Sequence, residues 1–508
     1  MAIDPSLGRL WSSGTATTLL ILLLTTAIAH LIRGWKRLQH IPGPQFASFS
    51  PAWIIKSLSS GQFHEELLKI SNQYGPLVRI GSNDLLCTDP DVLRRMSAVR
   101  SQYTKGDFYE TGRIIPGYNN IVCERDEEKH KALRASMNSA YQGRETGSLL
   151  GLEAAVDRQI EKLIALIEEK YVSEPGVLRP FELSAKSQFF ALDVIGDHSF
   201  GKPFGFLSED RDLFQYIEIN DSAVPIMNML QAMPWLSNIV YRWPFRLALP
   251  SDKDNAGFGR LMGLAKGHVD ERLRPGAKPS QDMLQAFSNG GMTYDELIQH
   301  MFVQIVAGSI TTAATIRHTL LALISTPTTY SRLRQEIDTF FASNPNTTTI
   351  PYTSALSLPY LQSVLHESLR FYPPTTGLGS KQVPPQGDII CGYAVPGGTQ
   401  IAHNFSGIMR LKPIFGDDAD VFRPERWLEA DEAQKKAMHS VVDLAFGSGK
   451  YECMGKRIAM VELNKIFVEL LRRYDFALVN PQKPIQVVSG IFWIGKDMWM
   501  RVTRRETF

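Results

Sequence analysis

The stretch "AFGSGKYECMGKRIA", Ala445 to Ala459, places Cys453 among three glycines and just before a run with helical spacing of apolar residues. At a helix start, the helix dipole and free backbone N–H groups stabilise a thiolate, and glycines let the backbone turn tightly toward the sulfur. A catalytic nucleophile, a metal ligand and an inert thiol all remain open. A nucleophile needs a base, and no sequence pattern links a histidine to this cysteine.

The composition of the 508-residue chain is that of a folded globular protein, with 44% hydrophobic and 21% charged residues. Its net charge of +2 gives no reason to expect a nucleic acid partner. The cysteines Cys87, Cys123, Cys391 and Cys453 lie far apart and form no C-x-x-C pair. We therefore expect neither a zinc site nor a disulfide framework, and a reducing compartment fits best.

The N-terminal stretch "TATTLLILLLTTAIAHLI", residues 15–32, contains no charged residue. As a helix it would span about 27 Å, close to one hydrocarbon core. Arg33, Lys36 and Arg37 follow at once, which predicts a single-pass anchor with the body in the cytosol. A cleaved signal peptide is the alternative, but its basic residues should precede the apolar run.

The proline-rich break "IPGP", residues 41–44, separates an anchor segment, 1–40, from a body without internal repeats, 41–508. Short β-like runs over 76–88 and 387–404 flank long helical patterns, so we expect a mainly α fold with small β-sheets. The stretch 294–325 is apolar on nearly every face, which predicts a buried central helix. A second membrane span is the alternative, and the ionisable residues within the stretch argue against it.

Four motifs occur in an order that resembles the cytochrome P-450 family. Phe446, Gly449, Cys453 and Gly455 match its heme loop F-x-x-G-x-x-x-C-x-G. "ESLR" at 367–370 matches E-x-x-R, "FRPERW" at 422–427 matches the P-E-R-F motif, and "AGSITT" at 307–312 matches A-G-x-D/E-T-T. The resemblance covers essentially the whole chain and is greatest to fungal microsomal enzymes of secondary metabolism, the pisatin-demethylase-like group.

The resemblance implies the P-450 fold, with a β-rich N-terminal lobe and a long central helix over heme b. It makes Cys453 the axial ligand of the heme iron, a role in which a thiolate favours O–O cleavage. Thr311 would help deliver protons to dioxygen, together with Ser309 and Thr312. Ordinary small-residue helix packing with back-bonded hydroxyls is the alternative for this stretch.

Glu367 and Arg370 are three residues apart and so share one helix face. The family resemblance adds Arg426 to a buried charge network, which contributes little net stability but is costly to break. Its expected role is to hold the heme-side loop in register. A solvated ion pair between Glu367 and Arg370 is the alternative.

The chain departs from the family pattern at four positions. His130 replaces the Trp of the family's Trp-x-x-x-Arg, and Lys381 stands where an arginine is common. Ile310 stands where an acid usually precedes the first threonine, and Tyr451 stands where a basic residue usually lies two before the cysteine. We expect His130, Arg134, Lys381 and Tyr451 to hold the heme propionates, with surface charges as the alternative.

The segments expected over the heme are rich in Ile, Met, Phe and Trp, which indicates a lipophilic small-molecule substrate; they are 108–122, 222–245, the central helix, 373–380 and 489–495.

No flavin or nicotinamide motif is present. Electrons should therefore come from NADPH–cytochrome P-450 reductase, with cytochrome b5 as a further donor, at the endoplasmic reticulum membrane. A basic docking face would comprise Lys129, Lys131, Lys450, Lys456, Arg457 and Lys465; scattered solubility charges are the alternative.

These features favour a heme-thiolate monooxygenase that hydroxylates, epoxidises or desaturates a lipophilic metabolite, such as a terpenoid, polyketide or alkaloid. A heme-thiolate isomerase, dehydratase or oxidative cyclase is the first rival, motivated by Ile310. A non-catalytic heme sensor or carrier is the second.

Overall fold

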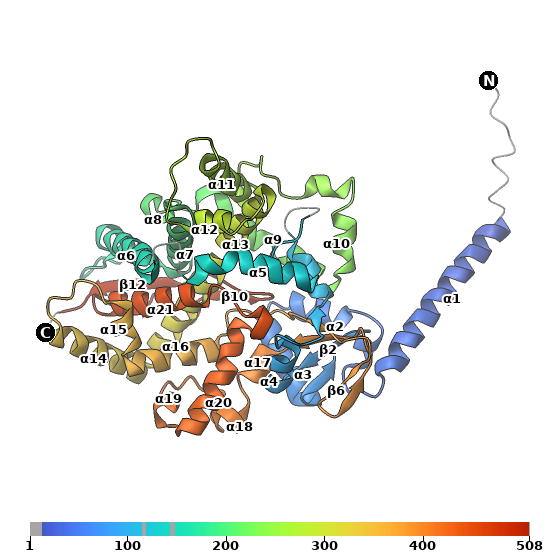
Figure 1. Cartoon of the computed structure of the whole chain (residues 1–508). Helices are drawn as coiled ribbons and strands as arrows, with labels where there is room; N and C mark the ends of the chain where they lie inside the picture. The colour runs from blue at the N-terminus through green and yellow to red at the C-terminus, as the bar shows by residue number, and fades with distance from the viewer. Residues whose placement is uncertain (1–12, 114–117, 143–147, 507–508) are drawn as a thin grey trace.

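The computed structural model describes residues 13–113, 118–142 and 148–506. The described chain is mostly helical with small sheets, which confirms the predicted fold class. Figure 1 shows a β-containing lobe near the base of the N-terminal helix α1 and a larger helical body beyond it. The body is crossed by the long helix α13.

The helices up to the central one are α1 (Ser13–Leu38), α2 (Ala52–Ser59), α3 (Phe63–Tyr74), α4 (Pro90–Ser97), α5 (Glu127–Gln142), α6 (Ser148–Leu166), α7 (Leu183–Phe200), α8 (Phe206–Glu209), α9 (Tyr216–Ala232), α10 (Trp235–Val240), α11 (Gly257–Arg272), α12 (Met283–Asn289) and α13 (Tyr294–Ser325). Those that follow are α14 (Pro327–Ser343), α15 (Tyr352–Leu356), α16 (Pro359–Phe371), α17 (Phe405–Ile408), α18 (Lys412–Phe415), α19 (Arg426–Glu429), α20 (Glu432–Val442) and α21 (Lys456–Leu471).

The largest described sheet has the strand order β1-β2-β8-β5-β3, with β2 and β8 parallel and the other pairs antiparallel. It is formed by β1 (Leu77–Arg79), β2 (Asp84–Cys87), β3 (Thr104–Lys105), β5 (Lys381–Gln382) and β8 (Gln400–His403). The other strands are β4 (Phe181–Glu182), β6 (Asp388–Ile390), β7 (Tyr393–Val395), β9 (Tyr474–Leu478), β10 (Gln486–Ser489), β11 (Trp493–Lys496) and β12 (Trp499–Arg504). The two runs predicted to be β-like therefore supply β1, β2 and β6 to β8.

The central helix α13 has the bounds predicted from the sequence. It begins at a capping box in which the Thr293 hydroxyl and the Glu296 carboxylate bond each other's backbone N–H groups. Among the described residues, it is the helix long and apolar enough to cross a membrane, and 72% of its most apolar window is buried. It packs against α7, α11, α16 and α21, so the prediction of a buried central helix is confirmed.

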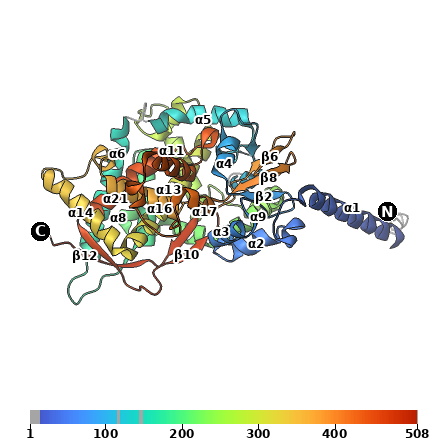
Figure 2. The same ribbon diagram turned by 90° about the horizontal axis from the view of Figure 1, so that it is seen from below.

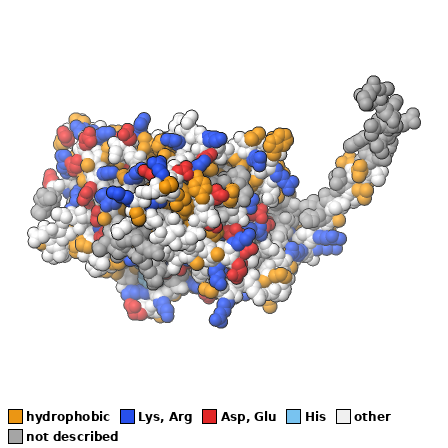
Figure 3. All heavy atoms as spheres, turned by 45° about the horizontal axis from the view of Figure 1, so that its top comes forward, with side chains coloured by type: hydrophobic (Ala, Val, Ile, Leu, Met, Phe, Trp, Pro, Cys, Tyr) orange, Lys and Arg blue, Asp and Glu red, His pale blue; other side chains and the backbone are white. Residues whose placement is uncertain are grey.

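Helix α1 projects away from the body in two perpendicular views (Figures 1 and 2). Leu19, Leu20 and Leu22 of this helix are each more than half accessible, whereas Leu38 at its C-terminal end is buried in the body. Figure 3 shows Lys and Arg side chains gathered where this arm meets the body. The segment 1–12 of the expected anchor lies outside the described residues.

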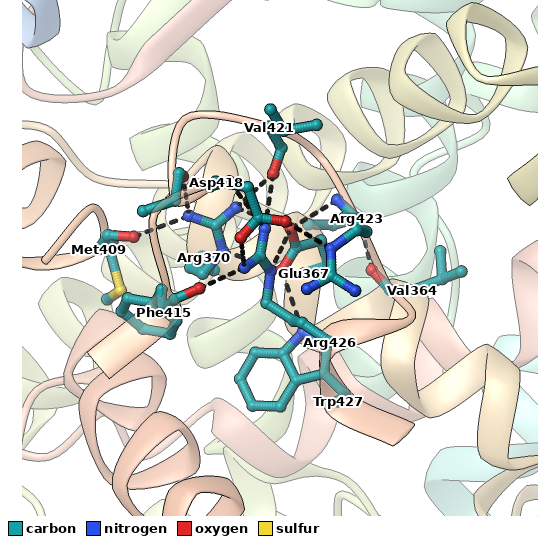
Figure 4. A network of polar contacts seen from close by, with 12 residues as sticks. Val364, Glu367, Arg370, Met409, Phe415, Asp418, Val421, Arg423, Arg426 and Trp427 are labelled. Atoms are coloured by element: carbon teal, nitrogen blue, oxygen red, sulfur yellow. Dashed lines mark hydrogen bonds and ion pairs between the residues drawn. The ribbon is translucent and has the colours of Figure 1, made fainter. Parts of the chain in front are cut away.

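The Glu367 carboxylate stands at the centre of a buried polar network between α16, α19 and the chain that joins α17 to α19 (Figure 4). It accepts hydrogen bonds from Arg370 at 2.7 and 2.8 Å and from the Nε of Arg426 at 3.1 Å. The indole N–H of Trp427 and the backbone N–H of Arg423 complete its shell at 3.0 and 2.8 Å. A carboxylate this deeply buried is stable only because every lone pair is used.

The two arginines extend the network to backbone carbonyls. Arg370 donates to the carbonyl oxygens of Met409, Ala419 and Val421 at 2.6 to 2.9 Å. Arg426 also reaches the Asp418 carboxylate at 2.9 Å. The network therefore fixes the irregular segment 409–427 that precedes α20 and the Cys453 loop.

Replacing Glu367 with Gln should leave Arg370 and Arg426 as buried charges with no partner carboxylate on α16. We expect a loss of about 3–5 kcal/mol in the free energy of unfolding, as for other broken buried pairs, measured by urea denaturation. Glu432→Gln is the matched control, because its ion pair with Lys435 is exposed, and its effect should stay below about 1 kcal/mol. Equal effects of the two changes would contradict a structural role for the network.

Candidate functional site

A cavity of about 320 Å³ lies between α13 and the Cys453 loop, and α5 contributes to its wall. This volume is within the range of small-molecule sites. The predicted site residues that line it are His130, Arg134, Thr311, Thr312, Phe446, Tyr451, Cys453 and Gly455. Gly449, Ser309 and Lys381 lie outside the lining.

Cys453 lies two residues before the Gly455 N-cap of α21, at the helix start expected from the sequence. Its own N–H donates to the Phe446 carbonyl oxygen at 2.6 Å, which closes the loop. Burial raises the pKa of the Cys453 thiol, and hydrogen bonds from the backbone N–H groups of Gly455 and Lys456 oppose this rise. The side chain is deep in the protein yet accessible, because it faces the cavity.

Two glycines of the loop have backbone conformations that disfavour a side chain. Gly447 has φ 72° and Gly449 has φ 57°. A Cβ on Gly449 would lie 2.1 Å from the carbonyl oxygen of Ser97 at the end of α4. Gly449 thus permits close packing of the loop on α4. The sequence had suggested instead that the glycines mainly let the backbone turn toward the sulfur.

The middle of α13 opens toward the cavity. Ala307 is exposed and Gly308 and Thr311 are partly exposed, within a helix that is otherwise largely buried. The Thr311 hydroxyl donates to the Ala307 carbonyl oxygen at 2.9 Å, so it is back-bonded while its oxygen still faces the cavity. A Cβ on Gly308 would lie 3.1 Å from Ile195, so this glycine also serves the packing of α13 on α7.

Ser309 and Ile310 face away from this cavity. The Ser309 hydroxyl is buried 3.4 Å from the Val306 carbonyl oxygen. Ile310 lines a separate cavity of about 70 Å³, together with Asp221 and Arg317. The structure therefore places Thr311 and Thr312 on a different face of α13 from Ser309 and Ile310, the two residues that precede them in the motif.

Two buried lysines are paired across β3 and β5; Lys105 lines the main cavity, and Lys381 lies outside its lining. Lys105 of β3 and Lys381 of β5 are directly opposite each other in the antiparallel register, and each is at most 5% exposed. The Lys381 ammonium lies 3.8 Å from the centre of the Tyr451 ring and 3.2 Å from the Tyr109 hydroxyl. Like charges paired across strands are destabilising, so this arrangement calls for an anion.

The pKa values of the residues at the Lys105 edge of the cavity also indicate that an anion would bind there. Burial lowers the pKa of Lys105 to about 7, and it lowers the pKa of Lys381 well below its usual range. Burial also lowers the pKa of His130, to about 3, with the nearby lysines and Arg134 adding to the effect. Neither lysine forms an ion pair within the described ranges 13–113, 118–142 and 148–506, so an anionic group in the cavity would stabilise their charged forms.

The other two predicted contacts already have partners. The Tyr451 hydroxyl donates to the Glu127 carboxylate, which Lys450 also contacts at 2.9 Å. The guanidinium of Arg134 donates to the Glu452 carbonyl oxygen at 2.7 Å. Both side chains nevertheless line the cavity and remain within reach of a group bound there.

Among the lining residues that sequence reasoning missed, two are buried and ionisable: Lys105 and Glu462. Lys105 lies in no recognised sequence motif, and its expected contribution to anion binding depends on its cross-strand pairing with Lys381. Glu462 of α21 is buried, burial raises its pKa well above the usual range, and its Oε2 has no hydrogen-bond partner among the described residues. An acid nine residues after the cysteine on an otherwise apolar helix face was the only signal available.

Comparison with known proteins identifies the family. The cytochrome P-450 family model matches residues 42–494. Cytochrome P-450 monooxygenase ABA1 of Pyricularia oryzae is 38% identical, with 99% of each chain covered. Cytochrome P-450 monooxygenase aba1 of Botryotinia fuckeliana is 37% identical, with 92% of each chain covered. Cytochrome P-450 monooxygenase abl1 of Leptosphaeria maculans is 35% identical, over 96% of this chain and 87% of the relative.

The chain belongs to the cytochrome P-450 family, whose cofactor is heme b. It is an oxidoreductase of the monooxygenase class. The residues present fit this cofactor. A cavity-facing thiol lies on one wall, and the side chains at the middle of α13 are small. At one edge, where two propionates would bring negative charge, Lys105 and Lys381 are buried and find no ion-pair partner among the residues that the structure describes.

Replacing Lys105 with Met removes one of the two facing charges without changing the length of the side chain much. We expect faster transfer of heme to a heme-scavenging protein, by about tenfold, the equivalent of one hydrogen bond to a charged group. Lys131→Met is the matched control, because Lys131 is exposed on α5, and its transfer rate should not change.

The same variant has a defined pH dependence. In the heme-free chain, unfolding lets Lys105 take up a proton at any pH between about 7 and its unfolded value near 10.4. Folding stability therefore rises with pH in this window, by at most about 1.4 kcal/mol per pH unit from this group. Lys105→Met should reduce that slope in urea denaturation of heme-free protein; an unchanged slope would contradict the unfavourable burial of its charge.

Proposed function

We propose that this protein is a membrane-anchored heme-thiolate monooxygenase that oxidises a lipophilic small molecule of fungal secondary metabolism. The observation that carries the proposal is the position of Cys453, whose thiol faces the cavity across from the small residues at the middle of α13. When bound, heme supplies the activation of dioxygen. Cys453 would hold its iron, and the N–H groups at the start of α21 would tune that sulfur.

The residues around the cavity have separate tasks in this proposal. Ala307 and Gly308 leave space for dioxygen, and the Thr311 oxygen accepts or passes a proton beside it. Lys105, Lys381, His130 and Arg134 hold the propionates. Glu462, held as a neutral acid by burial, stores a proton on the wall of the same cavity.

The apolar lining supports a lipophilic substrate. Of the five segments expected over the heme, three contribute to the lining: Ile121 and Val122, residues of α13, and Pro374 and Thr375. Residues 222–245 and 489–495 do not line it, and 114–117 lie outside the described residues. The substrate would therefore contact a narrower set of segments than the sequence suggested.

The proposed membrane attachment involves α1 and a second surface. Residues 222–245 comprise the C-terminal part of α9, all of α10 and the turn that follows, and they expose large apolar side chains, among them Ile226, Met229, Trp235 and Trp243. Such side chains suit the interfacial region of a bilayer. With α1 as the anchor in the endoplasmic reticulum membrane, the body would face the cytosol and admit substrate from the lipid side.

NADPH–cytochrome P-450 reductase is the proposed electron donor, with cytochrome b5 as an additional one. The basic face suggested from the sequence is smaller in the structure. Lys465 is wrong as a member, because it is 1% exposed and pairs with Glu153 and Asp157 at 2.6 and 2.9 Å. Lys129, Lys131 and Arg457 are exposed and remain candidates for contact with an acidic flavoprotein.

The test of this function is the consumption of NADPH and dioxygen by the purified protein with reductase and a panel of terpenoid, polyketide and alkaloid intermediates. A monooxygenase consumes both in proportion to product. Turnover without either would indicate an isomerase or dehydratase, and consumption of both without oxygen in the product would indicate an oxidative cyclase. A heme sensor or carrier would give no product from any intermediate.

Cys453→Ser should abolish the carbon monoxide difference spectrum that is typical of thiolate-ligated heme. The serine keeps the size and position of the side chain but lacks the thiolate donor. Cys123→Ser is the control, because Cys123 is buried beside Asn120 and outside the cavity lining. Retention of the spectrum in Cys453→Ser would mean that another residue is the ligand.

Thr311→Ala should increase the peroxide released per NADPH consumed, because the hydroxyl oxygen beside the proposed dioxygen space is lost. A tenfold change in partitioning corresponds to about 1.4 kcal/mol, a magnitude typical of one hydrogen bond. Thr319→Ala is the matched control on the same helix, since Thr319 is buried away from the cavity. Unchanged coupling in Thr311→Ala would remove the proposed proton role.

A further inference from the structure

A cysteine occupies an unfavourable position in the hairpin formed by β6 and β7. Ile390 pairs with Tyr393, so Cys391 and Gly392 are the two turn residues, and their φ angles are 50° and 82°. Two-residue turns with both φ angles positive favour Asn, Asp or Gly at the first position. A residue with a Cβ costs about 1–2 kcal/mol there, so the turn itself does not explain Cys391.

The contact that Cys391 makes does explain it. Its thiol hydrogen-bonds with the thiol of Cys87, the last residue of β2, although the two are 304 positions apart in the sequence. Both sulfurs also flank Asp89: the Asp89 N–H donates to Cys87 at 3.5 Å, and the Cys391 thiol lies 4.0 Å from its carboxylate. Cys87 is fully buried and Cys391 is partly exposed.

The two thiols are not equivalent. Their mutual hydrogen bond is the largest influence on each, and it lowers the pKa of Cys391 while raising that of Cys87 well above its usual value. Cys391 is the more accessible of the two thiols. Reactivity with oxidants follows thiolate character and exposure.

We propose that Cys87 and Cys391 form a reversible disulfide when the protein meets hydrogen peroxide. The Cys391 thiolate attacks one peroxide oxygen, the O–O bond breaks, and a sulfenic acid forms while the departing hydroxide takes a proton to become water. The Cys87 thiol then attacks the sulfenic sulfur, forms the S–S bond and releases a second water. Two thiols lose two electrons in total, and one peroxide is reduced to two waters.

The bond would act on the Cys453 loop through α4. The Asp89 carboxylate caps the start of α4, at 2.9 Å from the Asp91 N–H, and Arg95 of α4 holds Asp388 of β6 at 2.5 Å. At the far end of α4, the Ser97 carbonyl oxygen packs on Gly449 of the Cys453 loop. A disulfide at the start of α4 therefore fixes a helix whose other end supports the heme-binding loop.

The experiment exposes the full-length holoenzyme to hydrogen peroxide, alkylates the remaining thiols and maps the peptides by mass spectrometry. We expect one cross-linked peptide pair containing Cys87 and Cys391, which a dithiol reductant reverses. The oxidised protein should show a melting temperature at least about 2 °C higher, because the bond closes a very long loop, and slower heme loss.

Two variants separate this role from a packing role. Cys391→Asn gives the turn a favoured residue, so the reduced variant should be at least as stable as the original and show no peroxide-induced rise. Cys123→Ala keeps the reactive pair and should behave like the original. The proposal is overturned if Cys391 is oxidised to sulfinic acid while Cys87 can still be alkylated, or if peroxide leaves both thiols unchanged.

Discussion

The buried carboxylate of Glu367 is the constraint on which the placement of the Cys453 loop depends. Five donors from Arg370, Arg426, Trp427 and the Arg423 backbone converge on it; Arg370 lies on α16, and the other three residues lie at the end of the segment 409–427. Because five hydrogen bonds must be made to one carboxylate, the segment 409–427 is held in one arrangement. Its value is positional, since buried ion pairs contribute little net stability.

Aromatic packing links this network to α20, the helix that precedes the Cys453 loop. The Trp427 ring lies 5.2 Å from His366 of α16 and 4.9 Å from His439 of α20, measured between ring centres. Helix α20 leads directly into the chain that contains Phe446 and Cys453. A second support reaches the same loop from the β-containing lobe, where Lys450 donates to the Ser101 and Tyr103 carbonyl oxygens at 3.0 and 2.9 Å.

How far the sequence predicts this arrangement depends on whether the signal is local. The Cys453 loop, the Glu367 to Arg370 spacing and the bounds of α13 follow from motifs and periodicity within a few residues. Lys105 could not be found in this way, because its significance arises from a cross-strand register with Lys381. Lys465 was assigned to the surface because sequence does not reveal that Glu153 and Asp157 approach it from α6.

The substitution at Ile310 can be understood from the side of α13 on which it lies. This position faces the small cavity of Asp221 and Arg317, where burial lowers the pKa of Arg317 to about 10 and raises that of Asp221. The negative charges of Glu182 and Asp221 already stabilise the positive charge of Arg317. A further acid at 310 would add a carboxylate to a cavity that holds enough negative charge, and like charges disfavour ionisation. In the proposed mechanism, protons for Thr311 would travel along the main cavity, which Thr312 and Gln304 line from α13 and Glu462 lines from α21.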